Sequence, residues 1–174
     1  MQKTLKKSAA ALRDAEIPFA LAGGFAVWAR GGPQSDHDLD LMLKPEDAER
    51  ALTILGEAGM RMEKPPEGWL YKAFDGDVMV DLIFEPTGVA VDDALLHRAD
   101  EREVVALRMK VLAAEDIMVT KLLALREHEL DYDAILESAR SLREQIDWNE
   151  VRARTTESPF ARAFFTLAEE LEIF

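Results

Sequence analysis

The segment that most constrains this fold is HDLDLML, which ends at Leu43. In it Asp38 and Asp40 alternate with leucines, and such alternation is typical of a β-strand whose two faces meet different surroundings. Side chains two positions apart on a strand point the same way, about 6–7 Å apart along the chain. We therefore expect the two carboxylates to share one face, while the leucines enter a core on the other face.

Two carboxylates on one face of a strand repel each other unless a cation lies between them. A divalent ion is the expected cation, because Mg²⁺ prefers hard oxygen ligands. A third carboxylate, Asp81, is the only charged group in the apolar segment VMVDLIF. A lone carboxylate there is costly unless it pairs with a Lys, caps a strand end or binds a metal.

These three carboxylates can form one site if the strand of Asp81 lies beside the strand of Asp38 and Asp40. Enzymes of phosphoryl transfer use two metal ions about 3.5–4 Å apart to clamp the attacking and leaving oxygens. A third carboxylate can also take the proton from the attacking hydroxyl. The pattern therefore favours phosphoryl or nucleotidyl transfer at this strand.

A phosphate cradle is expected upstream, at Gly23 and Gly24, which join an apolar strand over residues 17–21 to a helix over residues 25–30. Glycines allow a tight turn, and the free N–H groups at the start of a helix suit a phosphate. An ordinary strand-to-helix turn has the same pattern.

We consider three further polar residues for this site on weaker sequence signals. Lys121 falls on the apolar face of an expected helix, where a lysine either extends outward to solvent or reaches a triphosphate. His37 directly precedes the aspartates and could contact a phosphate. Lys72 is expected to point to solvent.

Hydrophobic periodicity predicts an α+β fold, a mixed β-sheet with flanking helices followed by a C-terminal helical segment. The Asp-Gly dipeptide at residues 75–76 indicates a hairpin. We divide the chain into a catalytic domain over residues 1–112 and a helical region over residues 113–174 that packs on it. Expected helices cover residues 2–15, 25–30, 45–58, 92–98, 114–128, 132–145, 148–154 and 159–171, and expected strands cover residues 17–21, 38–43, 60–64, 70–74, 78–84, 104–107 and 111–112.

The composition excludes several classes of protein. The 174 residues carry a net charge of −13, which argues against non-specific binding to a nucleic-acid backbone and favours a cationic partner. The chain has no Cys, which excludes disulfides and thiolate metal sites. No apolar run approaches the roughly 18 residues of a membrane span, so we expect a cytoplasmic protein.

Taken in order, Gly23-Gly24, Asp38-x-Asp40 and Asp81 resemble the nucleotidyltransferase superfamily of the DNA polymerase β type. The later segment AAEDIMVTKLLALREHELDYDAIL resembles the helical segment of its small bacterial members, in which a lysine recurs at the position of Lys121. These members include antibiotic-modifying enzymes and proteins of toxin–antitoxin systems. The resemblance spans about residues 15–140.

The resemblance implies a Mg²⁺-dependent enzyme that transfers a nucleoside monophosphate from an NTP such as ATP to an acceptor hydroxyl, with release of pyrophosphate. Asp38 and Asp40 would hold the metals, with two ions during catalysis, and Asp81 would bind one metal and assist deprotonation. The nucleotide-binding residues would be Gly23, Gly24, Lys121 and His37.

The resemblance leaves the acceptor open between an aminoglycoside- or lincosamide-like antibiotic, a tRNA end and a protein hydroxyl. The H-D-L-D element is similar to that of the lincosamide-modifying group. Many relatives carry an Arg in the loop before the aspartates, but here the loop reads PQSDH, and Arg30 or His37 would have to replace it.

Two other functions remain as alternatives. The fold could serve as a catalytically inactive nucleotide-binding or partner-binding module. The apolar face of the last expected helix could instead form a homodimer, although core packing explains that face more simply.

Overall fold

The computed structural model describes residues 1–34 and 38–174. In these residues seven strands form one mixed sheet in the order β3-β4-β5-β2-β1-β7-β6. β2 runs antiparallel to β1 and parallel to β5, and β1 runs parallel to β7. The strands are β1 (Phe19–Leu21), β2 (Leu39–Leu43), β3 (Arg61–Glu63), β4 (Leu70–Asp75), β5 (Val78–Ile83), β6 (Asp100–Val104) and β7 (Leu107–Val111).

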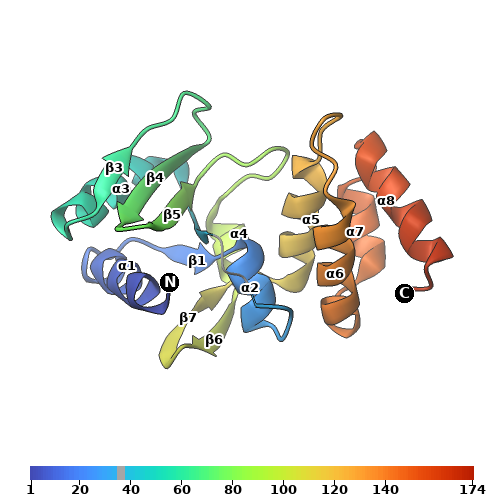
Figure 1. Ribbon diagram of the computed structural model, residues 1–174, viewed down its shortest axis with the longest axis horizontal. Coiled ribbons are helices and arrows are strands. Elements are labelled where there is room, and N and C mark those ends of the chain that lie inside the picture. The colour runs from blue at the N-terminus through green and yellow to red at the C-terminus, as the bar shows by residue number, and fades with distance from the viewer. Residues whose placement is uncertain (35–37) are drawn as a thin grey trace.

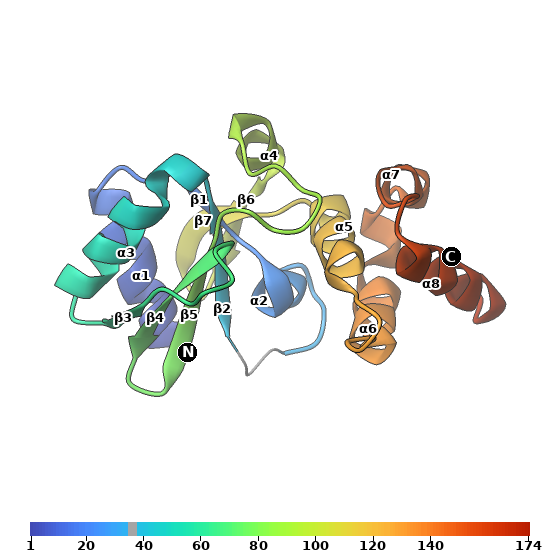
Figure 2. The ribbon, with the colours of Figure 1, turned by 90° about the horizontal axis from the view of Figure 1, so that it is seen from above.

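Helices cover both faces of this sheet and continue beyond it. Figure 2 shows α1 and α3 on one face, and α2 on the other face between the sheet and the helices α5 and α6. In Figure 1 the helices α5 to α8 lie together at the C-terminal end of the molecule. The helices are α1 (Gln2–Asp14), α2 (Gly23–Ala29), α3 (Ala48–Glu57), α4 (Asp93–Arg98), α5 (Ala114–Ala124), α6 (Tyr132–Leu142), α7 (Trp148–Arg154) and α8 (Pro159–Glu170), with 3₁₀ turns at Pro45–Asp47 and Arg143–Gln145.

The core on the α1 and α3 side follows from amphipathic sequences. Leu5 and Leu12 of α1 and Leu52 and Leu55 of α3 recur at helical spacing, and all are buried. They meet the leucine face of β2, where Leu41 is fully buried. Because the leucines of β2 face this core, its aspartates point to the opposite face, toward α2 and α5.

Helix α5 joins the sheet to the C-terminal helices, since it packs against α2, α6, α7 and α8. A buried ion-pair cluster reinforces this junction. Asp116 of α5 accepts hydrogen bonds from Arg98 Nε at 3.2 Å, from Arg98 Nη2 at 3.0 Å and from Arg154 Nη2 at 2.5 Å. The carboxylate side chain is only 1% exposed, so both arginines are needed to compensate its burial.

The α+β fold class is confirmed, but the strands predicted at residues 104–107 and 111–112 and the end of the helix predicted at residues 114–128 were wrong. Residues 104–107 do not form a strand, because Val105 and Ala106 adopt positive φ angles of 53° and 60° and turn the chain between β6 and β7. Such a turn normally uses Gly or Asn, so the sequence carried no turn signal here. The expected helix over residues 114–128 ends at Ala124, and Leu125 is already extended.

The division into residues 1–112 and 113–174 stays a prediction. Within the described residues, no helix has the length and the apolar character that crossing a membrane would require.

Candidate active site

The site forms along one row of paired residues that crosses three strands. Asp40 of β2 lies opposite Asp81 of β5, and Asp81 lies opposite Lys72 of β4. Directly paired residues of neighbouring strands point to the same face, so the three side chains lie together. The condition set by the sequence analysis, that the strand of Asp81 lies beside the strand of Asp40, is met.

Asp40 lies among negative charges in a poorly hydrated position. Its pKa is raised from 3.8 to about 7, first by burial and then by the charges of Asp81 and Asp38, against the opposing influence of Lys121 and Lys72. Among the described residues, no side chain donates a hydrogen bond to this carboxylate. Hard carboxylate oxygens that lie close to other negative charges are ligands that suit a divalent ion.

Position 23 requires a glycine, because its backbone lies directly against the Asp40 carboxylate. Its φ angle is +57°, in the left-handed region that favours glycine. A Cβ atom at this position would lie 1.7 Å from Asp40 Oδ2. The backbone at the start of α2 can therefore approach Asp40 only because residue 23 has no side chain. This contact places Gly23-Gly24 beside the Asp-bearing strand, as the sequence pattern predicted.

The first turn of α2 has no side-chain cap from the described residues. The preceding residue, Ala22, provides no side-chain cap, and no acidic residue lies in that turn. A cavity of about 200 Å³ adjoins it, and both Gly24 and Lys121 line this cavity together with residues of α6.

Lys121 extends from α5 toward the same region. Burial lowers the pKa of its ammonium group, while the charges of Asp40 and Asp131 raise it. Lys121 also lines the cavity beside Gly24, so its ammonium group belongs to the same region as Asp40. Asp131 is also the N-cap of α6, because its carboxylate accepts a hydrogen bond from Ala134 N.

Asp81 is held by Lys72, and the expectation that Lys72 points to solvent was wrong. Lys72 Nζ donates to Asp81 Oδ1 at 3.1 Å and to Asp81 Oδ2 at 3.4 Å. Burial raises the pKa of Asp81, and the hydrogen bond and charge of Lys72 oppose this shift. In the hairpin Asp75 pairs with Val78, and the same register sets residue 72 opposite residue 81. The position of the predicted hairpin turn therefore already indicated that Lys72 faces Asp81.

The predicted metal and catalytic roles of Asp38, Asp40 and Asp81 stay predictions. Asp38 is close enough to raise the pKa values of both Asp40 and Asp81. Within residues 1–34 and 38–174, however, no three His, Cys, Asp or Glu side chains are grouped as a set of metal ligands. Asp81 pairs with Lys72 instead, so a role of Asp38 and Asp40 as a pair of metal ligands belongs to the proposal below.

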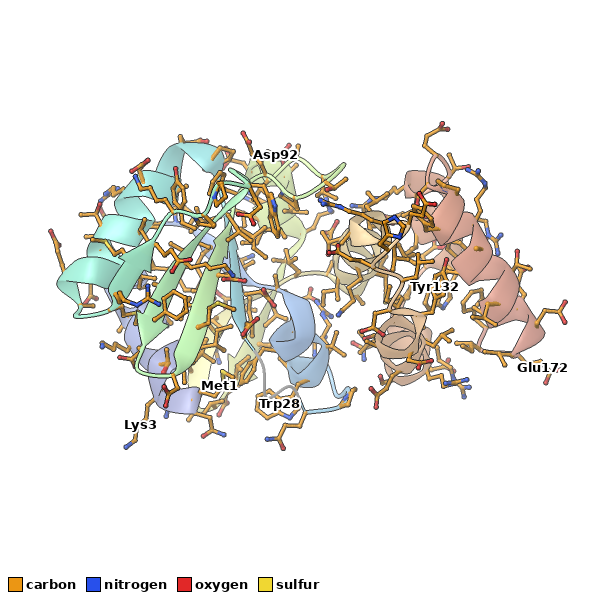
Figure 3. The ribbon with its side chains drawn as sticks, turned by 45° about the horizontal axis from the view of Figure 1, so that its top comes forward. Met1, Lys3, Trp28, Asp92, Tyr132 and Glu172 are labelled. Carbon is orange, nitrogen blue, oxygen red and sulfur yellow. The ribbon has the colours of Figure 1, made fainter. Side chains whose placement is uncertain are left out.

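The two candidates for the missing loop arginine have different outcomes. Arg30 is buried at the C-terminal end of α2. Its Nε donates to Leu112 O at 2.7 Å, and its Nη2 pairs with Asp100 at 2.6 Å. It is a structural residue that connects α2 to the strands β6 and β7. His37 lies outside the described residues. Figure 3 shows the side chains of the described residues on the ribbon, with Trp28 labelled on α2 and Tyr132 at the start of α6.

Comparison with known proteins identifies a family. The model of a family described as an uncharacterised nucleotidyltransferase matches residues 1–171. A search of curated proteins by sequence gave no match.

Solved structures share the fold at low sequence identity. The crystal structure of ANT(2")-Ia with adenylyl-2"-tobramycin is 18% identical, with a TM-score of 0.67 over 95% of this chain and 97% of that chain. The solution structure of the same antibiotic-resistance factor, also 18% identical, gives 0.68 over 99% and 97%. The lincosamide antibiotic adenylyltransferase LnuA, bound to lincomycin, is 14% identical and gives 0.58 over 79% and 96%.

Proposed function

This chain belongs to the nucleotidyltransferase family whose model matches residues 1–171, and from that premise we propose its reaction and the roles of its residues. The membership confirms the resemblance seen in the Gly-Gly, Asp-x-Asp and Asp81 pattern. The reaction is the transfer of a nucleoside monophosphate from an NTP, with ATP as the first candidate, to an acceptor hydroxyl. The observation that supports it most strongly is the pairing of Asp40 with Asp81 directly beside Gly23.

In the proposed reaction the acceptor oxygen forms a bond to the α-phosphorus of the NTP, and the bond from that phosphorus to the β-phosphate oxygen breaks. Pyrophosphate leaves with the electron pair of the broken bond. A divalent ion, Mg²⁺ by its preference for oxygen ligands, supplies charge stabilisation at the reacting phosphate when bound. Asp38 and Asp40 would hold this ion, since the charge of Asp38 acts unfavourably on the Asp40 carboxylate and a cation would relieve that repulsion.

Asp81 takes the proton of the acceptor hydroxyl in this proposal. Its neighbour Lys72 favours the ionised carboxylate, which is the form that can accept a proton. The sequence pattern also assigned Asp81 as a metal ligand, and this second role would compete with Lys72 for the same oxygens.

The nucleotide would lie on the α2 and α5 side of Asp40. Gly23 and Gly24 present backbone N–H groups there, and Lys121 offers an ammonium group to the triphosphate. The cavity beside Gly24 and Lys121 would receive another part of the nucleotide. His37, which directly precedes Asp38, is proposed as a further phosphate contact from its position in the sequence.

A small molecule that carries a hydroxyl group is the proposed acceptor, in preference to a tRNA end or a protein. One structural relative was solved in complex with adenylyl-2"-tobramycin, and another is a lincosamide antibiotic adenylyltransferase bound to lincomycin. The net charge of −13 favours a cationic acceptor over a polyanion. A cytoplasmic location and a homodimer stay predictions.

The test is incubation of the protein with each α-³²P-labelled NTP, Mg²⁺ and an acceptor panel of tobramycin, lincomycin, tRNA and the protein itself. We expect label on a small-molecule acceptor with stoichiometric release of pyrophosphate. The matched control is the Asp38→Asn/Asp40→Asn variant, which keeps the side-chain volumes and removes the charges. Its labelling should fall to the level without enzyme.

The inactive-module alternative predicts a different result. Calorimetric titration with a non-hydrolysable NTP would show Mg²⁺-dependent binding, while no acceptor in the panel would become labelled. Absence of NTP binding at millimolar concentrations would contradict both the enzyme and the nucleotide-binding module.

A further inference from the structure

We propose that Lys72 is the resident cation of Asp81 and that it limits the carboxylate site to one protein-bound divalent ion. This inference rests on the proposed function, because it concerns how the same site is charged. It makes Lys72 a positioning residue, which acts through Asp81 rather than on the nucleotide.

The contact between Lys72 and Asp81 uses both carboxylate oxygens. Lys72 Nζ lies 3.1 Å from Oδ1 and 3.4 Å from Oδ2, so the ammonium group is placed across the carboxylate. A second metal ion shared between Asp81 and the Asp38–Asp40 pair would need at least one of these oxygens. It would also meet the positive charge of Lys72 at short range, where two cations repel each other strongly.

The position of Lys72 is set by the sheet rather than by a flexible loop. The hairpin of β4 and β5 pairs Lys72 directly with Asp81, and neighbouring pairs fix the same register on both sides. The ammonium group also lies 3.3 Å from Met79 Sδ, on the same face of β5. With 23% of its side chain exposed, Lys72 cannot leave Asp81 for water without uncovering the partly buried stem.

The Asp38–Asp40 pair differs from Asp81 in this respect. In the described part of the chain no ammonium or guanidinium group forms an ion pair with Asp40, and Lys121 acts on it only at longer range. An ion can therefore enter between Asp38 and Asp40 without displacing a protein cation. At Asp81 it would have to displace Lys72.

The site would therefore use one divalent ion and the Lys72 ammonium group, where the sequence resemblance implied two divalent ions. The single ion would be held by Asp38 and Asp40, and Asp81 would remain available for the proton of the acceptor. The charge that a second ion would bring beside Asp81 is already present in Lys72.

The test counts bound Mn²⁺ without nucleotide, by the electron paramagnetic resonance signal of the free ion during titration to millimolar concentration. We expect one ion in the wild type and in Lys72→Arg, which keeps the charge. In Lys72→Met, which keeps the stem and removes the charge, we expect two. The added Asp81→Asn change in the Lys72→Met background should return the count to one.

Lys7→Met is the matched control, because it also removes a Lys–Asp pair, the 2.6 Å contact with Asp75, away from the site. Its count should stay at one. Lys72→Gln provides a second neutral variant, and thermal melting monitored by circular dichroism verifies that each variant is folded.

Two ions in the wild type, or one ion in both neutral Lys72 variants, would overturn the inference. If the wild type bound two ions and still labelled an acceptor, only the inference would fail. If the wild type bound no Mn²⁺ and labelled no acceptor, the proposed function would fail with it.

Discussion

Two aspartates of this chain, the fully buried Asp116 and the partly buried Asp40, have opposite electrostatic surroundings. Asp116, at the junction of α4, α5 and α7, is compensated by Arg98 and Arg154. Asp40, on the sheet, faces the like charges of Asp38 and Asp81, and its pKa is raised to about 7. The difference separates a carboxylate that holds helices together from one that no protein cation of residues 1–34 and 38–174 pairs with. A carboxylate with a strongly shifted pKa that lies against Gly23, beside a cavity, is a functional-site candidate.

The largest effect should come from Asp40→Asn, which keeps the shape of the side chain and removes its charge. Turnover should fall about 10³-fold or more, because the ion loses a charged ligand at the reacting phosphate. The metal-free fold should become more stable at pH 8, since charge repulsion is relieved. Labelling kinetics and urea unfolding measure the two effects. A loss of stability together with activity would make Asp40 a structural residue like Asp116.

The opposite behaviour is expected for Asp116→Ala. This change removes the shared partner of Arg98 and Arg154, which are both partly exposed to water, and should cost about 2–3 kcal/mol of unfolding free energy. Urea unfolding followed by circular dichroism measures it. The control is Glu150→Ala, which removes a partly exposed partner of Arg154 and should cost about 1 kcal/mol or less. Equal losses in the two variants would contradict the structural role of Asp116.

A smaller stability change is expected for Gly23→Ala, but with a specific effect on activity. The new methyl group would overlap the Asp40 carboxylate, so metal binding and turnover should fall. Gly76→Ala is the matched control, because Gly76 has a similar φ of 64° and no atom within 4 Å of its added Cβ. Gly76→Ala should lose about 1–2 kcal/mol through backbone strain, and Gly23→Ala should lose more than Gly76→Ala because its methyl group also overlaps Asp40. Mn²⁺ titration distinguishes them, and unchanged Mn²⁺ binding in Gly23→Ala would remove Gly23 from the site.

The smallest effect concerns pH. The folded pKa of Asp40, about 7, exceeds its ordinary value of 3.8, so protonation favours the metal-free fold. The stability that comes from protonated Asp40 is fully present below pH 3.8 and is lost as the pH rises through about 7. Because a proton competes with the ion, Mn²⁺ affinity should fall as the pH drops below 7, by up to about tenfold per pH unit. Titrations between pH 6 and 8 test this, with Asp40→Asn expected to show a flatter profile.

Local patterns accounted for the part of the site that lies on single elements. The alternation in HDLDLML predicted the shared face of Asp38 and Asp40, and the glycines at residues 23–24 predicted the turn beside them. Most helix and strand positions followed from the same periodicity. The turn at Val105-Ala106 was missed because non-glycine residues adopt positive φ angles there, which local propensity does not indicate.

The sequence by itself determined the α+β class, the family and the identity of the aspartates, because strand alternation and turn chemistry act between near neighbours. Only the tertiary structure decided which cation each carboxylate meets. Lys72 goes to Asp81, Arg30 to Asp100, and Arg98 with Arg154 to Asp116. These pairings depend on strand register and helix packing between distant segments, and burial then sets how strongly each charge is felt.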